Sequence, residues 1–278
     1  MKKINRRSFL AAAGLTAAAL ALTACGGSAS STASSTASSA ASSEAASTSA
    51  AAELTTVEAG KLTMATNAAF PPYEMTTDAG EFEGIDIDTA KAIAEKLGLE
   101  LQIDDMDFDA ALLSVQQGKA DIVIAGVTVT DERKAVMDFS DSYATGIQSI
   151  IVPEGSDITS PDDLAGKKIG TQRGTTGYIY CSDDFGDDAV VAYDDGLTAV
   201  QALNNGQVDA VVIDNAPAKE FVAANPGLVI LDTSYAEEDY AIGLAKGSAL
   251  EDAVNAALEE LKADGTLQSI VDKYITAE

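Results

Sequence analysis

Residues 114–133, SVQQGKADIVIAGVTVTDER, hold a helix end, a buried strand and the polar residues that follow the strand. The helical run ends at Gly118, where a left-handed residue suits a helix C-terminus, and a run of four apolar residues begins at Ile122. The same order recurs at 201–214, QALNNGQVDAVVID, where Gly206 takes the place of Gly118. Two copies of one unit predict two lobes built on one plan, although any α/β protein contains helix-to-strand turns of this kind.

The flanking sequence alternates β-like runs with helical patterns. KLTMAT (61–66) and LELQIDDM (99–106) are typical of strands. GIDIDTAKAIAEKLG (84–98) places apolar residues at helical spacing, and FDAALLSVQQG (108–118) follows as another helix with a glycine stop. This alternation predicts an α/β fold, and residues 54–278 are numerous enough to build two lobes with cores of their own.

The first 53 residues have the composition of an export signal and a linker. Residues 1–24 combine a basic start, MKKINRRSFL, with an apolar run too short to span a bilayer comfortably and small residues before Cys25. We expect cleavage of this signal peptide, lipidation of Cys25 and a flexible Ser/Ala/Thr linker over 25–53. A short uncleaved anchor is the alternative. The RRSFL run fits a twin-arginine signal or an ordinary basic segment equally.

Charge and residue content exclude several classes of function. The chain carries 17 basic and 44 acidic residues, a formal net charge of −27. This field disfavours nucleic acid and anionic lipid as partners, so the lipid anchor would be the only link to a membrane. The lack of histidine removes the commonest general base and the commonest zinc ligand, and it leaves Cys181 without an activating partner. We therefore expect no catalytic residue, no metal site and no cofactor.

Arg133 is unusual in this acidic chain, because it lies in the expected first turn of a helix, where the helix dipole disfavours a cation. Its guanidinium offers two parallel donors that match a carboxylate, and the hydroxyls of Thr128 and Thr130 lie close in sequence. The alternative is a solvated surface arginine beside Asp131 and Glu132. Residues that break a local preference, such as a cation in the first turn of a helix, often lie at functional sites. The position of Arg133 is therefore also consistent with a carboxylate clamp.

Two further strand ends carry binding chemistry, because ligands of open α/β sheets bind beyond the carboxyl ends of the strands. QRGTTG (172–177) brings glycines and the amides and hydroxyls of Thr175 and Thr176 toward an anion, or else forms a plain turn. Asp214 ends the second buried strand, where its carboxylate would pair with an ammonium group, cap the following helix, or do both.

Aromatic residues lie near the same strand ends. Phe70 follows the first strand and Phe108 precedes the second helix, and both would either close over a ligand or pack in the core. An anion clamp opposite a carboxylate, with apolar walls between them, describes a receptor for a zwitterion. An α-amino acid is the simplest such molecule.

Several segments, in the right order, resemble the polar amino-acid-binding subunits of ABC importers, the solute-binding proteins of family 3. The resemblance covers residues 61–274, and its most specific part is GVTVTDERKAVMDFSDSY (126–143). Other matching segments are FPPYE (70–74), DLAGKKIGTQRGTTG (163–177) and GQVDAVVIDNAPA (206–218).

The resemblance implies a type II periplasmic-binding-protein fold, in which two α/β lobes enclose a ligand cleft. Lobe 1 would comprise residues 54–149 plus 239–278, and lobe 2 residues 150–238. Two crossover segments, near SIIV (149–152) and EEDYAI (237–242), would form the hinge.

Position by position, the resemblance also implies a binding set for the backbone of an amino acid. The α-carboxylate would be held by Arg133, with help from Thr128 and the amide of Thr176. The α-ammonium would be held by Asp214 and the carbonyl group of Gly126.

The side chain of the ligand would lie between Phe70 and Phe108. The sequence departs from some relatives here, because Asn67 stands where binders of basic amino acids and of glutamine often have Asp. Gln172 stands where a glutamine-binding relative has Lys. The missing carboxylate at position 67 favours a neutral or polar amino acid.

The function implied is that of a monomeric receptor, anchored by lipid on the outer side of the cytoplasmic membrane. It would deliver a free amino acid to the permease of an ABC importer. The alternative is an enzyme on the same scaffold, such as a cyclohexadienyl-type dehydratase. That chemistry needs a positioned acid or base, and Glu74 or Asp214 would have to supply it without any motif that indicates this role.

Overall fold

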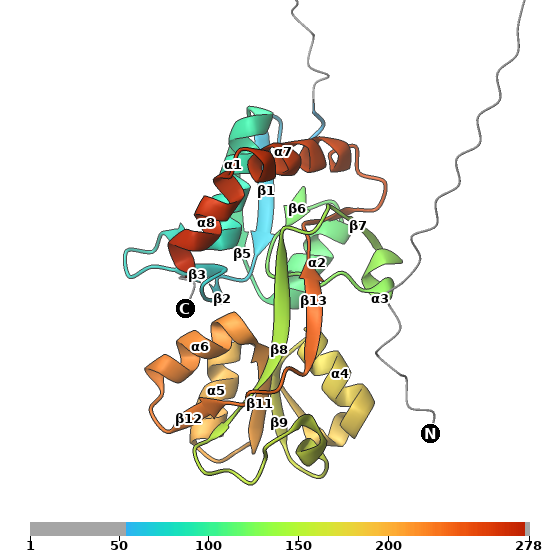
Figure 1. Ribbon diagram of the computed structural model, residues 1–278. Helices are drawn as coiled ribbons and strands as arrows, with labels where there is room; N and C mark the ends of the chain where they lie inside the picture. The colour runs from blue at the N-terminus through green and yellow to red at the C-terminus, as the bar shows by residue number, and fades with distance from the viewer. Residues whose placement is uncertain (1–53, 276–278) are drawn as a thin grey trace, which may run out of the picture. The chain divides into compact units, whose positions relative to one another are not determined.

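A computed structural model describes residues 54–275 of the protein (Figure 1). The expected signal peptide, the lipidated Cys25 and the linker lie outside these residues. None of the helices in the described part has the length and apolar character that crossing a membrane requires.

The first sheet has five strands in the order β5-β1-β6-β14-β7. Strand β1 runs parallel to β5 and β6, whereas β14, from the C-terminal part of the chain, runs antiparallel to β6 and β7. The strands β2, β3 and β4, which follow β1 in the chain, form a separate three-stranded sheet in the order β2-β3-β4. The strands are β1 (Lys61–Thr66), β2 (Ala69–Phe70), β3 (Glu74–Thr76), β4 (Phe82–Glu83), β5 (Glu100–Asp105), β6 (Ile122–Val123), β7 (Met137–Phe139) and β14 (Gly243–Ala245).

The second sheet has the order β10-β9-β11-β8-β12, with β13 paired to β8 outside this path. Strand β9 runs parallel to β10 and β11, and β8 runs antiparallel to β11, β12 and β13. The strands are β8 (Ala144–Pro153), β9 (Ile169–Gln172), β10 (Val190–Tyr193), β11 (Ala210–Asp214), β12 (Leu228–Ile230) and β13 (Ala236–Tyr240).

Helices cover both faces of each large sheet (Figure 1). One face of the first sheet packs on α1, α7 and α8, and the other packs on α2. In the second sheet α5 and α6 cover one face and α4 the other. The helices are α1 (Ile85–Leu97), α2 (Phe108–Gln116), α3 (Asp131–Lys134), α4 (Thr176–Phe185), α5 (Gly196–Asn204), α6 (Asn215–Ala224), α7 (Glu251–Ala263) and α8 (Thr266–Tyr274), with short 3-10 turns at Pro161–Leu164 and Asp187–Ala189.

Strands β8 and β13 lie side by side and run from one lobe to the other (Figure 1). Their antiparallel register pairs Ala144 with Tyr240 and Gln148 with Ala236. The mixed α/β fold in two lobes is therefore confirmed. The boundaries of the lobes at 149/150 and 238/239 stay a prediction.

The repeated unit of the sequence is visible in the structure. Gly118 and Gly206 have nearly the same left-handed backbone, with φ of 66° and 68°. In each unit the following aspartate accepts a backbone hydrogen bond: the N–H of Thr63 in β1 donates to Asp121 at 2.8 Å, and the N–H of Lys168, directly before β9, donates to Asp209 at 2.8 Å. The two copies thus share their hydrogen bonding as well as their residue pattern.

The two aspartates differ in burial, which makes them a matched pair for a stability test. Asp121 is 6% exposed and also accepts from the N–H of Val57 at 2.7 Å, whereas Asp209 is exposed. Asp121→Ala leaves two amides without their acceptor and should lower the free energy of unfolding by about 1–3 kcal/mol. This corresponds to a fall in Tm of roughly 2–10 °C in a thermal melt. Asp209→Ala is the control and should cost clearly less, so equal losses would contradict the burial argument.

Candidate functional site

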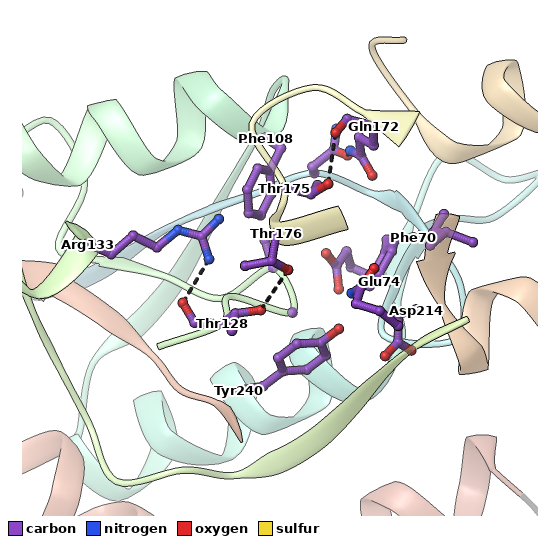
Figure 2. Close-up of a pocket in the computed structure, with 15 residues that line it drawn as sticks. Phe70, Glu74, Phe108, Thr128, Arg133, Gln172, Thr175, Thr176, Asp214 and Tyr240 are labelled. Atoms are coloured by element: carbon purple, nitrogen blue, oxygen red, sulfur yellow. Dashed lines mark hydrogen bonds between the residues drawn. The ribbon is translucent and has the colours of Figure 1, made fainter. Parts of the chain in front are cut away.

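One pocket brings together all ten residues that the sequence analysis proposed for ligand binding (Figure 2). Most of them lie at strand ends: Asn67 follows β1, Gln172 ends β9 and Asp214 ends β11. Five other residues also line the pocket. The predicted residues are Asn67, Phe70, Phe108, Gly126, Thr128, Arg133, Gln172, Thr175, Thr176 and Asp214, and the additional ones are Glu74, Ala125, Gln148, Ile213 and Tyr240.

Arg133 is buried, with 8% of its surface exposed, so the alternative of a solvated surface arginine is wrong. Its Nη1 donates to the carbonyl oxygen of Thr128 at 2.7 Å, and its Nη2 donates to that of Gly174 at 3.1 Å. The guanidinium also lies 5.4 Å from the ring centre of Phe108, a cation–π distance. Burial lowers the pKa of Arg133, but an arginine stays protonated at neutral pH.

Arg133 forms no ion pair within residues 54–275, although the negative charge of the buried Glu238 acts on it and opposes the lowering of its pKa. Both of its hydrogen-bond acceptors are neutral carbonyl groups, and none of the ion pairs among these residues includes it. A buried cation is costly without a partner of opposite charge. The guanidinium is therefore prepared to take an anion inside the pocket.

Asp214 is 2% exposed and accepts two backbone hydrogen bonds. The N–H of Ile147 donates to Oδ2 at 2.7 Å, and the N–H of Ala216 donates to Oδ1 at 3.0 Å. The second bond makes Asp214 the cap of α6, so one residue both caps the helix and borders the pocket. Burial raises the pKa of its carboxyl to about 6, against the opposing effect of these hydrogen bonds.

The two charged groups lie on different sides of the pocket. Figure 2 shows Arg133 on one side, Asp214 and Glu74 on the other, and the ring of Tyr240 between them. Tyr240 has room there only because residue 146 is a glycine: a Cβ on Gly146 would lie 2.4 Å from the Cζ of that ring.

An amide pair from the two lobes closes another part of the pocket. The Nε2 of Gln172 donates to the Oδ1 of Asn67 at 2.9 Å, and the Nδ2 of Asn67 donates to the carbonyl oxygen of Met106 at 2.9 Å. Asn67 and Gln172, the two residues that depart from the pattern of some relatives, thus contact each other. Phe70, which stacks on Tyr73 at 5.8 Å, supplies an aromatic wall.

The turn at 172–177 brings the second lobe against the first. Thr175 caps α4 by accepting from the N–H of Tyr178, and its hydroxyl donates to the carbonyl oxygen of Gln172 at 2.8 Å. Gly174 has φ of 72°, and a Cβ there would lie 1.6 Å from the Oδ1 of Asp109 on α2. Glycine is therefore required at 174 both by the backbone and by the contact between the lobes.

Two buried acids lie together at the pocket, and the sequence analysis did not predict that they pair. Glu74 and Asp86 are both 0% exposed, and the N–H of Gly126 donates to the Oδ2 of Asp86 at 2.8 Å. The carboxyl groups of Glu74 and Asp86 interact with each other, and the oxygens of Glu74 have no other hydrogen-bond partner within the described part of the chain. Burial, and secondarily the charge of Asp86, raise the pKa of Glu74 well above its ordinary value. Burial likewise raises the pKa of Asp86.

Because the pKa of Glu74 is raised, the folded protein binds more protons than the unfolded chain above pH 4.5, the ordinary pKa of this group. The stability that Glu74 contributes is therefore present below that pH and is lost as the pH rises toward the pKa of the folded state. Glu74→Gln should raise Tm at pH 8 and flatten its decline between pH 5 and 8. The exposed Glu81→Gln is the control. If Tm of Glu74→Gln declined with pH as steeply as that of the wild type, the raised pKa of Glu74 would be contradicted.

Within residues 54–275 there is no group of three or more Asp, Glu, Cys or His residues that could hold a metal ion. The chemistry of the pocket is instead that of one buried guanidinium, carboxylates on the opposite side, and amide and aromatic walls between them. Such a pocket suits a small molecule with separated anionic and cationic groups.

Comparisons with known proteins agree with this geometry. A probable histidine-binding protein of Neisseria gonorrhoeae is 32% identical over 283 residues, which cover 99% of this chain and 98% of that protein. The L-cystine-binding protein TcyJ of Escherichia coli K12 is 33% identical over 226 residues, 80% of this chain and 85% of that protein. The solved structure of the arginine-, lysine-, histidine-binding protein ArtJ from Geobacillus stearothermophilus matches with a TM-score of 0.75 and 35% identity, covering 78% of this chain and 96% of that one.

The family-level match covers nearly all of the described residues. The model of the bacterial extracellular solute-binding proteins, family 3, matches residues 62–277, which include both lobes and every residue that lines the pocket. Two further relatives are named as an arginine-binding and a glutamine-binding protein of ABC transporters. The chain therefore belongs to the bacterial extracellular solute-binding proteins of family 3.

Proposed function

We propose that this protein binds a free amino acid outside the cytoplasm and delivers it to the permease of an ABC importer. The observation that carries the proposal is the buried guanidinium of Arg133, which forms no direct ion pair among the described residues and lies across one pocket from Asp214. An α-amino acid carries a carboxylate and an ammonium group that match these two poles. Relatives of the chain include a glutamine-binding and an arginine-binding protein of ABC transporters.

The α-carboxylate would be held by the guanidinium of Arg133 and by backbone amides. Within residues 54–275, the N–H groups of Thr128 and Thr176 donate to no other residue, so both are available to a ligand. Thr176 is the first residue of α4, where free N–H groups and the helix dipole favour an anion.

The α-ammonium would be held by the carboxylate of Asp214 and the carbonyl oxygen of Gly126. Gly126 has φ of 53° and its N–H is fixed by Asp86. The ring of Phe70 lies 3.0 Å from the position that a Cβ would take at Gly126, so the glycine also lets the aromatic wall approach the strand end.

The side chain of the ligand would lie against Phe70, Phe108 and the amides of Asn67 and Gln172. These amides are neutral and already hydrogen-bonded to each other, so this part of the pocket offers dipoles and no full charge. We infer a neutral or polar side chain. The relatives named for arginine, histidine and cystine show that this family of pockets has been adapted to several side chains.

The location follows from the same proposal. Cleavage of residues 1–24 and lipidation of Cys25 would hold the protein at the outer surface of the cytoplasmic membrane, with residues 25–53 as a tether. We infer a monomer, because a single chain carries all the residues of the pocket. We infer binding without catalysis, because both oxygens of Asp214 are engaged by backbone amides and Glu74 is fully buried.

Arg133→Ala should abolish binding while the protein stays folded. A thermal-shift screen of the standard amino acids first identifies the ligand by a rise in Tm. Titration calorimetry then measures Kd, which should increase at least about 100-fold, because a buried charge pair loses one partner. The exposed Arg173→Ala is the control and should bind as the wild type does. Binding by Arg133→Ala within a few-fold of wild type would refute the carboxylate clamp.

Ligand affinity should fall below pH 6. The carboxyl of Asp214 has a pKa of about 6 and must be ionised to pair with an ammonium group, so protonation competes with binding. For an amino acid whose own side chain does not titrate, Kd should rise about tenfold per pH unit well below 6. Asp214→Asn should bind weakly at every pH and lose this dependence. A wild-type Kd that stays constant from pH 7.5 to 5 would exclude this role for Asp214.

A further inference from the structure

Glu238 is a buried carboxylate that neither the sequence analysis nor the proposed ligand contacts explain. It lies on β13 and is 6% exposed. Its Oε1 is buried and has no hydrogen-bond partner within residues 54–275. Its Oε2 accepts three hydrogen bonds: from the hydroxyl of Thr176 at 2.9 Å, from the hydroxyl of Thr128 at 3.0 Å and from the Nε2 of Gln148 at 3.0 Å.

The three donors come from different parts of the fold. Thr128 follows β6 of the first sheet, and Thr176 begins α4 beside the second sheet. Gln148 lies on β8, the crossover strand that pairs with β13. A single oxygen of Glu238 therefore connects both lobes with both crossover strands.

The two hydroxyls cannot serve Glu238 and a ligand carboxylate at the same time. Each threonine hydroxyl carries one hydrogen; both hydroxyl oxygens lie within hydrogen-bond distance of the Oε2 of Glu238, and they lie 3.4 Å from each other. The two hydrogens are thus used among Glu238 and the two threonines. A ligand carboxylate in this arrangement depends on Arg133 and on the backbone amides of Thr128 and Thr176. The hydroxyls of Thr128 and Thr176 would then serve to hold the backbone amides of the same residues in position.

Glu238 also fixes the residue that holds the guanidinium. The carbonyl oxygen of Thr128 accepts from the Nη1 of Arg133 at 2.7 Å, and the neighbouring Val129 donates its N–H to the carbonyl oxygen of Asp239 on β13. Thr128 is thereby anchored through its side chain and through the next peptide group. A shift of β13 would move the acceptor of Arg133.

We propose that Glu238 is a positioning residue that couples closure of the two lobes to assembly of the carboxylate clamp. This inference rests on the proposed function. When the lobes separate, Thr176 leaves with the second lobe and the carboxylate loses a donor. A buried carboxylate is stable only when donors surround it, so the bond from Thr176 favours the closed arrangement, in which the clamp is complete.

The contact of Glu238 with Thr176 joins groups that meet only in the closed cleft, so its loss should act on dissociation of the ligand. Interactions that form after the encounter chiefly change the dissociation rate and leave the association rate nearly constant. A side chain that only stabilised the fold would lower Tm without separating the two rates.

The test compares Glu238→Ala, Glu238→Gln and the control Glu237→Ala, whose side chain is exposed on the same strand. The amino acid found by the thermal-shift screen is the probe, and stopped-flow binding with a dye-labelled protein gives both rates. Glu238→Ala should dissociate at least about tenfold faster, with an association rate within about threefold of wild type. Glu238→Gln keeps an oxygen acceptor of the same size and should recover most of the loss, because its amide oxygen can accept from the same hydroxyls.

The outcomes separate this inference from the proposed function. If the wild type binds an amino acid but Glu238→Ala keeps the rates of Glu237→Ala, the inference is wrong and the receptor function stands. Tighter binding by Glu238→Ala would also overturn it, because Glu238 would then compete with the ligand for the two hydroxyls. Failure of the wild type to bind any amino acid would instead refute the proposed function. Melting curves without ligand show whether each variant is folded.

Discussion

The burial of one positive charge organises the cleft. Arg133 is held by two carbonyl oxygens, one from each lobe, and by the ring of Phe108, but it forms no direct ion pair with a carboxylate among the described residues. Desolvating a guanidinium without an anion is unfavourable, and this cost is reduced when an anionic ligand enters. The same side chain joins the proposed anion site to the contact between the lobes, because its guanidinium donates to the carbonyl oxygen of Gly174.

The crossover strands β8 and β13 supply the frame for this arrangement. Their antiparallel pairing places Gly146 opposite Glu238, and the small residue at 146 leaves space for the ring of Tyr240 in the pocket. The N–H of Ile147 on β8 holds Asp214, the proposed partner of the ammonium group. The same strands that connect the lobes thus also position the groups proposed to recognise both ends of an amino acid.

The sequence predicted the residues whose chemistry is tied to a local pattern. Asp214 follows an apolar strand and precedes a helix, and Arg133 breaks the expected charge pattern of a helix start, so each can be recognised from its neighbours alone. The roles of Glu238 and Glu74 could not be predicted in this way. Glu238 lies in the acidic run EEDY (237–240), which from the sequence alone predicts a solvent-exposed segment. Because β13 pairs with β8, alternate side chains of this run, those of Glu238 and Tyr240, are buried.

Hydrophobic periodicity and glycine placement in the sequence predict the α/β fold and the repeated helix-to-strand unit, and the short motifs predict the family by resemblance. Which groups meet depends on the tertiary structure. Asn67 and Gln172 are 105 positions apart in the chain, and Thr128 and Glu238 are 110 apart, yet each pair is within hydrogen-bond distance. Local propensity carries no information on such distances. They are set by the packing of two sheets around a shared pair of strands, and that packing turns separate strand ends into one binding pocket.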